Sequence, residues 1–95
     1  MLNRRNSMTV SAEIFTKPSC PYCVKAKSLL TENNITFSEK IVGKDISKDD
    51  IQEIVDNMGV ETTIRTVPQI FFHNASVGRV EYIGGYTELT KYFED

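Results

Sequence analysis

The sequence predicts an α/β domain built on a four-stranded mixed sheet with helices on both faces. Three observations support this prediction: stretches of alternating apolar residues, two segments with helical apolar spacing, and two apolar runs separated by a short turn near the C-terminus. In chain order they give β-α-β-α-β-β-α. The first β-α-β unit requires a parallel strand pair with a right-handed crossover. The later hairpin adds two antiparallel strands.

The first half of the chain supplies a strand, a helix and a second strand. Apolar and polar residues alternate over Val10–Ile14, and residues 16–19 interrupt the pattern. Pro21 suits the first turn of a helix, because its missing N–H would be unpaired there. Asn33-Asn34 ends this helix. The alternation over Ile35–Glu39 predicts the second strand.

The second half supplies a helix, a hairpin and a terminal helix. Ser47 caps a helix that ends at Gly59. The apolar run Ile70–Phe72 and the segment Val77–Ile83 predict a hairpin around a turn at residues 74–76, and this hairpin is expected to protrude. A helix follows over Thr87–Phe93, and the residues expected to face the core are Leu89, Tyr92 and Phe93.

Length and composition narrow the class of protein. The 95 residues predict one domain: a flexible arm at residues 1–8 and a folded unit at 9–95. The net charge of -2, from 11 basic and 13 acidic residues, gives no electrostatic reason to expect nucleic acid. No apolar run approaches the ~20 residues of a membrane span. The polar start lacks a secretory h-region. A cytoplasmic protein is therefore expected.

Cys20-Pro21-Tyr22-Cys23 holds both cysteines of the chain. A helix that begins between them leaves Cys20 at its exposed tip, whereas Cys23 shares the inner face with Ala26 and Leu30. Partial positive charge at the helix N-terminus and the cation of Lys17 favour the Cys20 thiolate. Cysteines in such settings have pKa values of roughly 3.5–7.5. Thiol–disulfide exchange is therefore predicted, with Cys20 attacking and Cys23 resolving.

Two other interpretations of the cysteine pair remain. A zinc site needs about four ligands. The chain offers two cysteines and one distant histidine, His73, so a metal would require a second subunit or a bound thiol. The pair could also be purely structural. Redox chemistry is favoured because vicinal cysteines in a cytosolic protein are more often catalytic than structural.

Two further segments have a functional interpretation when they are considered together with the cysteine pair. Thr66-Val67-Pro68 is an ordinary turn by itself. A cis proline facing the cysteines would instead expose the backbone of Val67 to an extended peptide. The second segment is Gly84-Gly85-Tyr86-Thr87-Glu88. It is either a plain turn, or a place where the glycines let a ligand come close to the backbone and the following helix N-terminus binds a carboxylate.

Together these segments resemble a dithiol glutaredoxin of the CPYC type. The matching stretches cover most of the chain: Cys20–Lys27, Thr66–Phe71 and Gly84–Thr87. The compact form also resembles bacteriophage glutaredoxins. The resemblance implies a thioredoxin-like fold, a cis peptide before Pro68, and glutathione as reductant without a metal.

The resemblance also implies roles for individual residues. Cys20 would be the nucleophile and Cys23 the resolving thiol in a glutathione-dependent disulfide oxidoreductase. The residues expected around glutathione are Lys17, Tyr22, Arg65, Thr66, Val67, Pro68, Gly85, Tyr86, Thr87 and Glu88. Glu88 stands where the family usually has Asp, and Arg65 would add a cation for a glutathione carboxylate.

Partners follow from the same resemblance. They are glutathione and disulfide-containing or glutathionylated proteins, with ribonucleotide reductase as one protein partner, and the chain is expected to be a monomer. Three rival functions stay open: a thioredoxin-type carrier reduced by a flavoprotein reductase, a glutathione-bridged iron–sulfur carrier, and a non-catalytic adaptor. The candidate glutathione residues argue against the first, and Pro21 argues against the second.

Overall fold

The computed structural model describes residues 10–94 of the chain. Their elements follow the order predicted from the sequence, β-α-β-α-β-β-α. The predicted flexible arm at residues 1–8 lies outside the described residues. The elements are β1 (Val10–Thr16), α1 (Pro21–Glu32), β2 (Thr36–Ile41), α2 (Lys48–Asn57), β3 (Gln69–Asn74), β4 (Arg79–Gly84) and α3 (Tyr86–Phe93).

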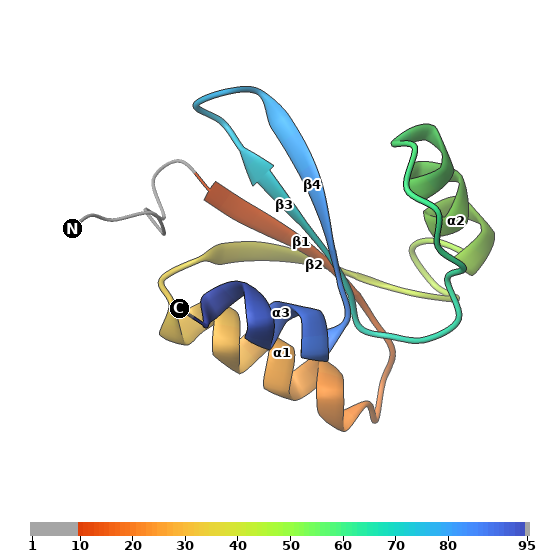
Figure 1. The fold of residues 1–95 in the computed structure, drawn as a ribbon. Helices are drawn as coiled ribbons and strands as arrows, with labels where there is room; N and C mark the ends of the chain where they lie inside the picture. Colours follow the sequence, from red (N-terminus) through yellow and green to blue (C-terminus); the bar gives the residue numbers. More distant parts are fainter. Residues whose placement is uncertain (1–9, 95) are drawn as a thin grey trace.

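The four strands form one mixed sheet in the order β2-β1-β3-β4. β1 pairs in parallel with β2 and antiparallel with β3, and β3 pairs antiparallel with β4. In Figure 1, α1 and α3 lie together against one face of the sheet and α2 lies on the other. The predicted sheet with helices on both faces is therefore confirmed.

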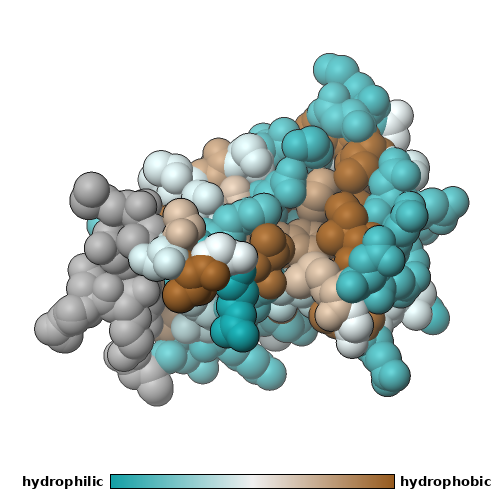
Figure 2. All heavy atoms as spheres, turned by 90° about the horizontal axis from the view of Figure 1, so that it is seen from above, coloured by the Kyte–Doolittle hydropathy of each residue, from teal (hydrophilic) through white to brown (hydrophobic). Residues whose placement is uncertain are grey.

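The two faces of the sheet carry separate apolar clusters. Neighbouring residues of a strand point to opposite faces, so Ile14 packs toward α1 and α3 while Phe15 packs toward α2. Both side chains are almost fully buried, and each such burial stabilises the fold by roughly 1.5–3 kcal/mol. Seen from above, apolar residues also gather at the surface between the sheet and α2 (Figure 2).

Several predicted boundaries were wrong. β1 does not break at Thr16, because this β-branched residue is buried and its hydroxyl donates a hydrogen bond to Glu39. β2 continues past Glu39 to Ile41 because it stays in register with β1. The hairpin turn lies at residues 75–78, and the return strand begins at Arg79. The hairpin protrudes at the top of Figure 1, as expected.

The helix ends follow their capping residues. Ser47 caps α2, accepting a hydrogen bond from the backbone N–H of Asp50 while the Asp50 carboxylate accepts one from the backbone N–H of Ser47. α3 begins at Tyr86, one residue before the predicted start. Tyr92 was predicted to face the core, and its ring packs edge-on against Phe72 and against Phe93, but the residue is still 39% exposed.

Candidate active site

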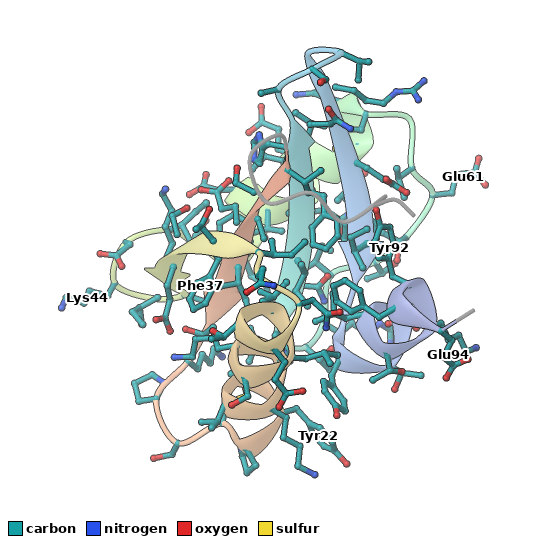
Figure 3. The ribbon with its side chains drawn as sticks, turned by 90° about the vertical axis from the view of Figure 1, so that its left-hand side faces the viewer. Tyr22, Phe37, Lys44, Glu61, Tyr92 and Glu94 are labelled. Carbon is teal, nitrogen blue, oxygen red and sulfur yellow. A yellow bond between two sulfur atoms is a disulfide. The ribbon has the colours of Figure 1, made fainter. Side chains whose placement is uncertain are left out.

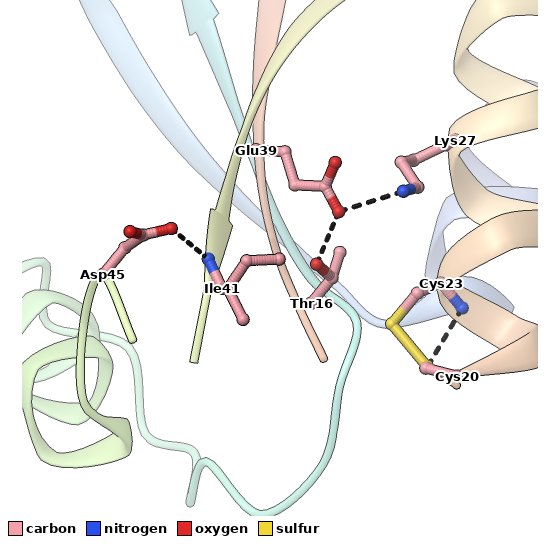
Figure 4. Close-up of polar contacts among 7 residues, drawn as sticks. All are labelled: Thr16, Cys20, Cys23, Lys27, Glu39, Ile41 and Asp45. Atoms are coloured by element: carbon pink, nitrogen blue, oxygen red, sulfur yellow. Dashed lines mark hydrogen bonds and ion pairs between the residues drawn. A yellow bond between two sulfur atoms is a disulfide. The ribbon is translucent and has the colours of Figure 1, made fainter. Parts of the chain in front are cut away.

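The cysteine pair lies at the N-terminus of α1. Cys20 is the N-cap residue, and its Sγ accepts a hydrogen bond from the backbone N–H of Cys23 at 3.2 Å. Cys20 is half-buried, whereas Cys23 is 2% exposed. The two sulfurs form a disulfide (Figure 4). The predicted arrangement of an accessible and a shielded cysteine is therefore present.

This position suits Cys20 to act as the leaving and attacking sulfur. The first N–H groups of a helix have no partner within it, and the helix dipole places partial positive charge there. In the disulfide, the Cys23 N–H already points at Cys20 Sγ. When the disulfide is reduced, the same donor is available to a thiolate on Cys20. Pro21 supplies no competing N–H at the first helical position.

A cavity of about 340 Å³ opens beside Tyr22 and Val67, and we call it the Val67 cavity. The cavity lies close to Cys20, since Cys20 Sγ is 3.8 Å from the carbonyl oxygen of Val67, one of its lining residues. The Val67-Pro68 peptide bond is cis, as the resemblance implied. All eight lining residues are among the candidates named from the sequence: Tyr22, Thr66, Val67, Pro68, Gly85, Tyr86, Thr87 and Glu88.

Two tyrosines form one wall of the Val67 cavity. The rings of Tyr22 and Tyr86 lie 5.7 Å apart between centroids, at an interplanar angle of 34°. The Lys25 ammonium lies 5.2 Å from the centroid of the Tyr22 ring, a cation–π distance. Tyr22 projects from the exposed N-terminal end of α1 (Figure 3). The wall is therefore an aromatic surface with a cation at its outer edge.

The N-terminus of α3, which begins at Tyr86, also borders the Val67 cavity. The backbone N–H of Gly85 donates to Glu88 Oε1 at 2.9 Å, so the Glu88 carboxylate caps its own helix. Gly84 has a φ of 117°, in a region that a side chain rarely adopts. The tight turn at Gly84 thus brings the helix N-terminus and one carboxylate to the cavity.

Two candidate residues lie elsewhere. Arg65 is exposed and is not among the residues lining the Val67 cavity. Lys17 is also exposed and lines a second cavity of about 430 Å³. We call this the Glu39 cavity; Lys17, Cys20, Cys23, Lys27 and Glu39 are among its lining residues.

The Glu39 cavity holds a charged cluster that the sequence analysis did not identify. Glu39 Oε2 accepts hydrogen bonds from the Thr16 hydroxyl at 2.6 Å and from Lys27 Nζ at 2.9 Å (Figure 4). The Thr16 hydrogen bond and, after it, the Lys27 ammonium lower the pKa of Glu39. The available signal was the spacing of Lys27, four residues after Cys23 and so on the same side of the helix.

Within residues 10–94, no group of three or more His, Cys, Asp or Glu side chains is arranged to hold a metal ion. None of the helices in this part of the chain combines the length and the apolar character that crossing a membrane requires.

Comparison with known proteins identifies the family. The family model described as Glutaredoxin matches residues 12–77. The chain is 40% identical over 65 residues to glutaredoxin 1 of Rickettsia felis, covering 68% of this chain and 60% of that protein. It is 37% identical over 83 residues to hybrid peroxiredoxin hyPrx5 of Haemophilus influenzae, covering 87% of this chain but 29% of that protein.

A solved structure extends the likeness to the fold. Glutaredoxin 1 of Francisella tularensis superposes with a TM-score of 0.59 at 38% identity, covering 86% of this chain and 90% of that one. The architecture is therefore thioredoxin-like, and the cysteine pair fits a CxxC dithiol centre. With its fold, its disulfide at a helix N-terminus and its matching segments, this chain belongs to the glutaredoxin family.

Proposed function

We propose that this protein is a glutathione-dependent thiol–disulfide oxidoreductase, in which Cys20 exchanges disulfides with substrates and Cys23 resolves the product. One observation carries the proposal: the accessible sulfur of Cys20 caps a helix beside the Val67 cavity. Glutaredoxins use glutathione as their reductant. The cavity supplies what a small peptide needs, namely the backbone around Val67 and a helix N-terminus.

Glutathione joined to Cys20 would extend along the Val67 cavity. The Val67 backbone would pair with the peptide as an added strand does. The N-terminus of α3, at Thr87 and Glu88, would take the charged γ-glutamyl end. Tyr22 would cover the peptide from the α1 side. The positions of Lys17 and Arg65 outside this cavity leave them as peripheral cations for the carboxylates of the ligand.

The reaction with a glutathione mixed disulfide needs only Cys20. The Cys20 thiolate attacks the glutathione sulfur, the bond to the substrate breaks, and the substrate leaves as a thiolate that takes up a proton. A second glutathione thiolate then attacks the glutathione sulfur on Cys20. Oxidised glutathione forms and the Cys20 thiolate is restored.

The reaction with a protein disulfide needs both cysteines. Cys20 forms a mixed disulfide with one substrate sulfur, and the other substrate sulfur leaves. The Cys23 thiolate then attacks Cys20 Sγ, which closes the Cys20–Cys23 disulfide and releases the reduced protein. Two glutathiones reduce this disulfide in turn. Because Cys23 is buried one turn inside α1, it reaches Cys20 more readily than it reaches a substrate.

The partners of the proposed reaction are glutathione and proteins with exchangeable disulfides. Family resemblance points to ribonucleotide reductase as one of them. The similarity to a hybrid peroxiredoxin supports a second candidate, a thiol peroxidase whose oxidised cysteine this protein would reduce. We place the reaction in the cytoplasm, performed by a monomer.

The test compares wild type, Cys20→Ser and Cys23→Ser in the glutathione-dependent reduction of a small mixed disulfide. We expect Cys20→Ser to lose activity and Cys23→Ser to keep it. With a protein disulfide as substrate, both variants should be inactive. A wild type inactive with glutathione but active with a thioredoxin reductase would contradict the proposal and favour a thioredoxin-type carrier.

A further inference from the structure

The Glu39 cavity is lined by two opposite charges and by the buried Cys23. Lys27 follows Cys23 by four residues in α1, so the two side chains are neighbours on the same side of the helix. Cys23, Lys27 and Glu39 line one cavity. The Lys27 and Glu39 side chains are only 31% and 30% exposed. Their charges are therefore less screened than those of a fully exposed pair.

The pair is fixed in place by a buried hydroxyl. Thr16 is 1% exposed, and its Oγ1 donates to the same Glu39 oxygen that Lys27 contacts. By contrast, Lys17 is an exposed loop residue that also lines this cavity. Lys27 thus stays near Cys23, but with a carboxylate beside it that offsets its charge.

These charges act on Cys23 in opposite directions. A cation near a thiol favours the thiolate, and a carboxylate disfavours it. Only the thiolate attacks a disulfide. We propose that the Lys27–Glu39 pair sets the reactivity of the resolving cysteine, with Lys27 promoting the Cys23 thiolate and Glu39 restraining it. This inference rests on the proposed dithiol route. Both charged residues would act through Cys23 and not by touching the substrate.

The step that the pair controls is the closure of the disulfide. Cys23 loses a proton to solvent through the Glu39 cavity, and its sulfur attacks Cys20 Sγ of a mixed disulfide. One S–S bond forms, one breaks, and the substrate sulfur leaves with the electron pair. The restraint by Glu39 would keep the mixed disulfide long enough for exchange with glutathione, whereas Lys27 would keep closure from becoming too slow.

The test is a titration of Cys23 alone, in a Cys20→Ser background, followed by the ultraviolet absorbance of the thiolate. We expect Lys27→Met to move the midpoint up and Glu39→Gln to move it down, each by about half a pH unit, or roughly threefold in thiolate fraction below the midpoint. The double variant should return close to the background value. Opposite shifts that cancel are not expected from loss of folding.

The chain provides a matched control. Lys40 and Glu13 form another Lys–Glu pair between β2 and β1, 2.8 Å apart, on the face of the sheet that carries α2. Lys40→Met and Glu13→Gln should leave the titration unchanged. The charged residues that line the same cavity as Cys23 are Lys17, Lys27 and Glu39, and Glu88 of α3 lines the neighbouring Val67 cavity. A Lys17→Met shift as large as that of Lys27→Met would contradict the assignment.

A kinetic measurement tests whether the pair changes the rate at which Cys23 closes the disulfide. The reduced protein is mixed with excess dithiodipyridine, an uncharged aromatic disulfide. The first molecule of pyridinethione is released when Cys20 attacks the reagent. The second is released when Cys23 attacks Cys20 Sγ and closes the disulfide. Lys27→Met should slow the second release about threefold and Glu39→Gln should speed it as much, with the first release unchanged. Shifts of the same sign, or equal effects on both releases, would overturn the inference.

These two measurements distinguish a failure of the inference from a failure of the proposed function. Neither measurement uses glutathione. If the wild type releases only one pyridinethione, Cys23 does not resolve and the dithiol route is wrong. If it releases two but the charge variants leave the second release and the titration unchanged, the dithiol route stands and the role of the pair is overturned.

Discussion

The two cavities beside the disulfide are built from different parts of the polypeptide. The Val67 cavity is lined by the loop residues before β3, by Gly85 and the N-terminus of α3, and by Tyr22. The Glu39 cavity is lined by charged side chains on α1 and β2, together with both cysteines. Backbone groups recognise a peptide whatever its side chains are, whereas fixed charges alter the ionisation of a neighbouring thiol. The difference suggests that one cavity binds substrate and the other controls the chemistry.

Around the Val67 cavity, the largest loss of stability is expected from Gly84→Ala. Gly84 has a φ of 117°, and a Cβ there would lie 3.0 Å from Glu88 Cγ. We expect the free energy of unfolding to fall by ~1–3 kcal/mol, measured by urea titration. Gly85→Ala is the matched control, because its Cβ would meet Glu88 Oε1 at 3.4 Å without a positive φ. Equal losses in the two variants would contradict this account of the turn.

A smaller effect is expected in the Glu39 cavity from Thr16→Val. The substitution keeps the shape of a buried side chain but removes the hydroxyl that donates to Glu39. We expect a loss of ~1–2 kcal/mol at neutral pH, because a hydrogen bond to a charged group disappears. Thr16→Ser keeps the donor and should retain more of the stability than valine does. A valine variant as stable as wild type would show that the hydrogen bond contributes nothing.

A change of several-fold in substrate binding is expected from Glu88→Gln. Glu88 caps α3 and brings a carboxylate to the Val67 cavity. We expect the KM for glutathione to rise roughly threefold, about 0.7 kcal/mol, with the Cys20 reaction toward dithiodipyridine unchanged. Steady-state kinetics measure the first quantity and stopped-flow absorbance the second. A slower reaction of Cys20 with dithiodipyridine in this variant would mean that Glu88 acts through the cysteine and not through the ligand.

The smallest effect is the acid dependence contributed by Glu39. Its pKa is lowered from the ordinary 4.5, so the unfolded state binds this proton more readily than the folded state. The stabilisation is present above pH 4.5 and is lost as the pH falls through the lowered pKa. Glu39→Gln should flatten the pH dependence of unfolding below that value. Unchanged curvature in the glutamine variant would contradict the contact.

Much of the fold and of the Val67 cavity could be predicted from the sequence, because local rules decide them. Pro21 and the CxxC spacing fix the start of α1. The three segments around the Val67 cavity each have a recognisable local pattern, and the structure brings them together. Tyr92 was placed inward because helical spacing says which face a residue shares, but not how far a neighbouring element covers it.

The Glu39 cavity could not be predicted in the same way. Glu39 was seen only as one position of an alternating strand, and Thr16 as the end of another. Their contact with Lys27 joins β1, β2 and α1, elements far apart in the sequence. No local rule places three side chains from separate elements around one oxygen. The spacing of Lys27 from Cys23 was the one signal available.

The most direct test of the account is to locate glutathione on Cys20. The Cys23→Ser variant, treated with oxidised glutathione, should form a stable mixed disulfide at its single cysteine. Comparing amide NMR spectra with and without the bound glutathione then shows which cavity the peptide occupies. The account predicts shifts concentrated at Val67 and at Gly85–Glu88. Shifts concentrated at Lys27, Glu39 and Ile41 would contradict the division of roles between the two cavities.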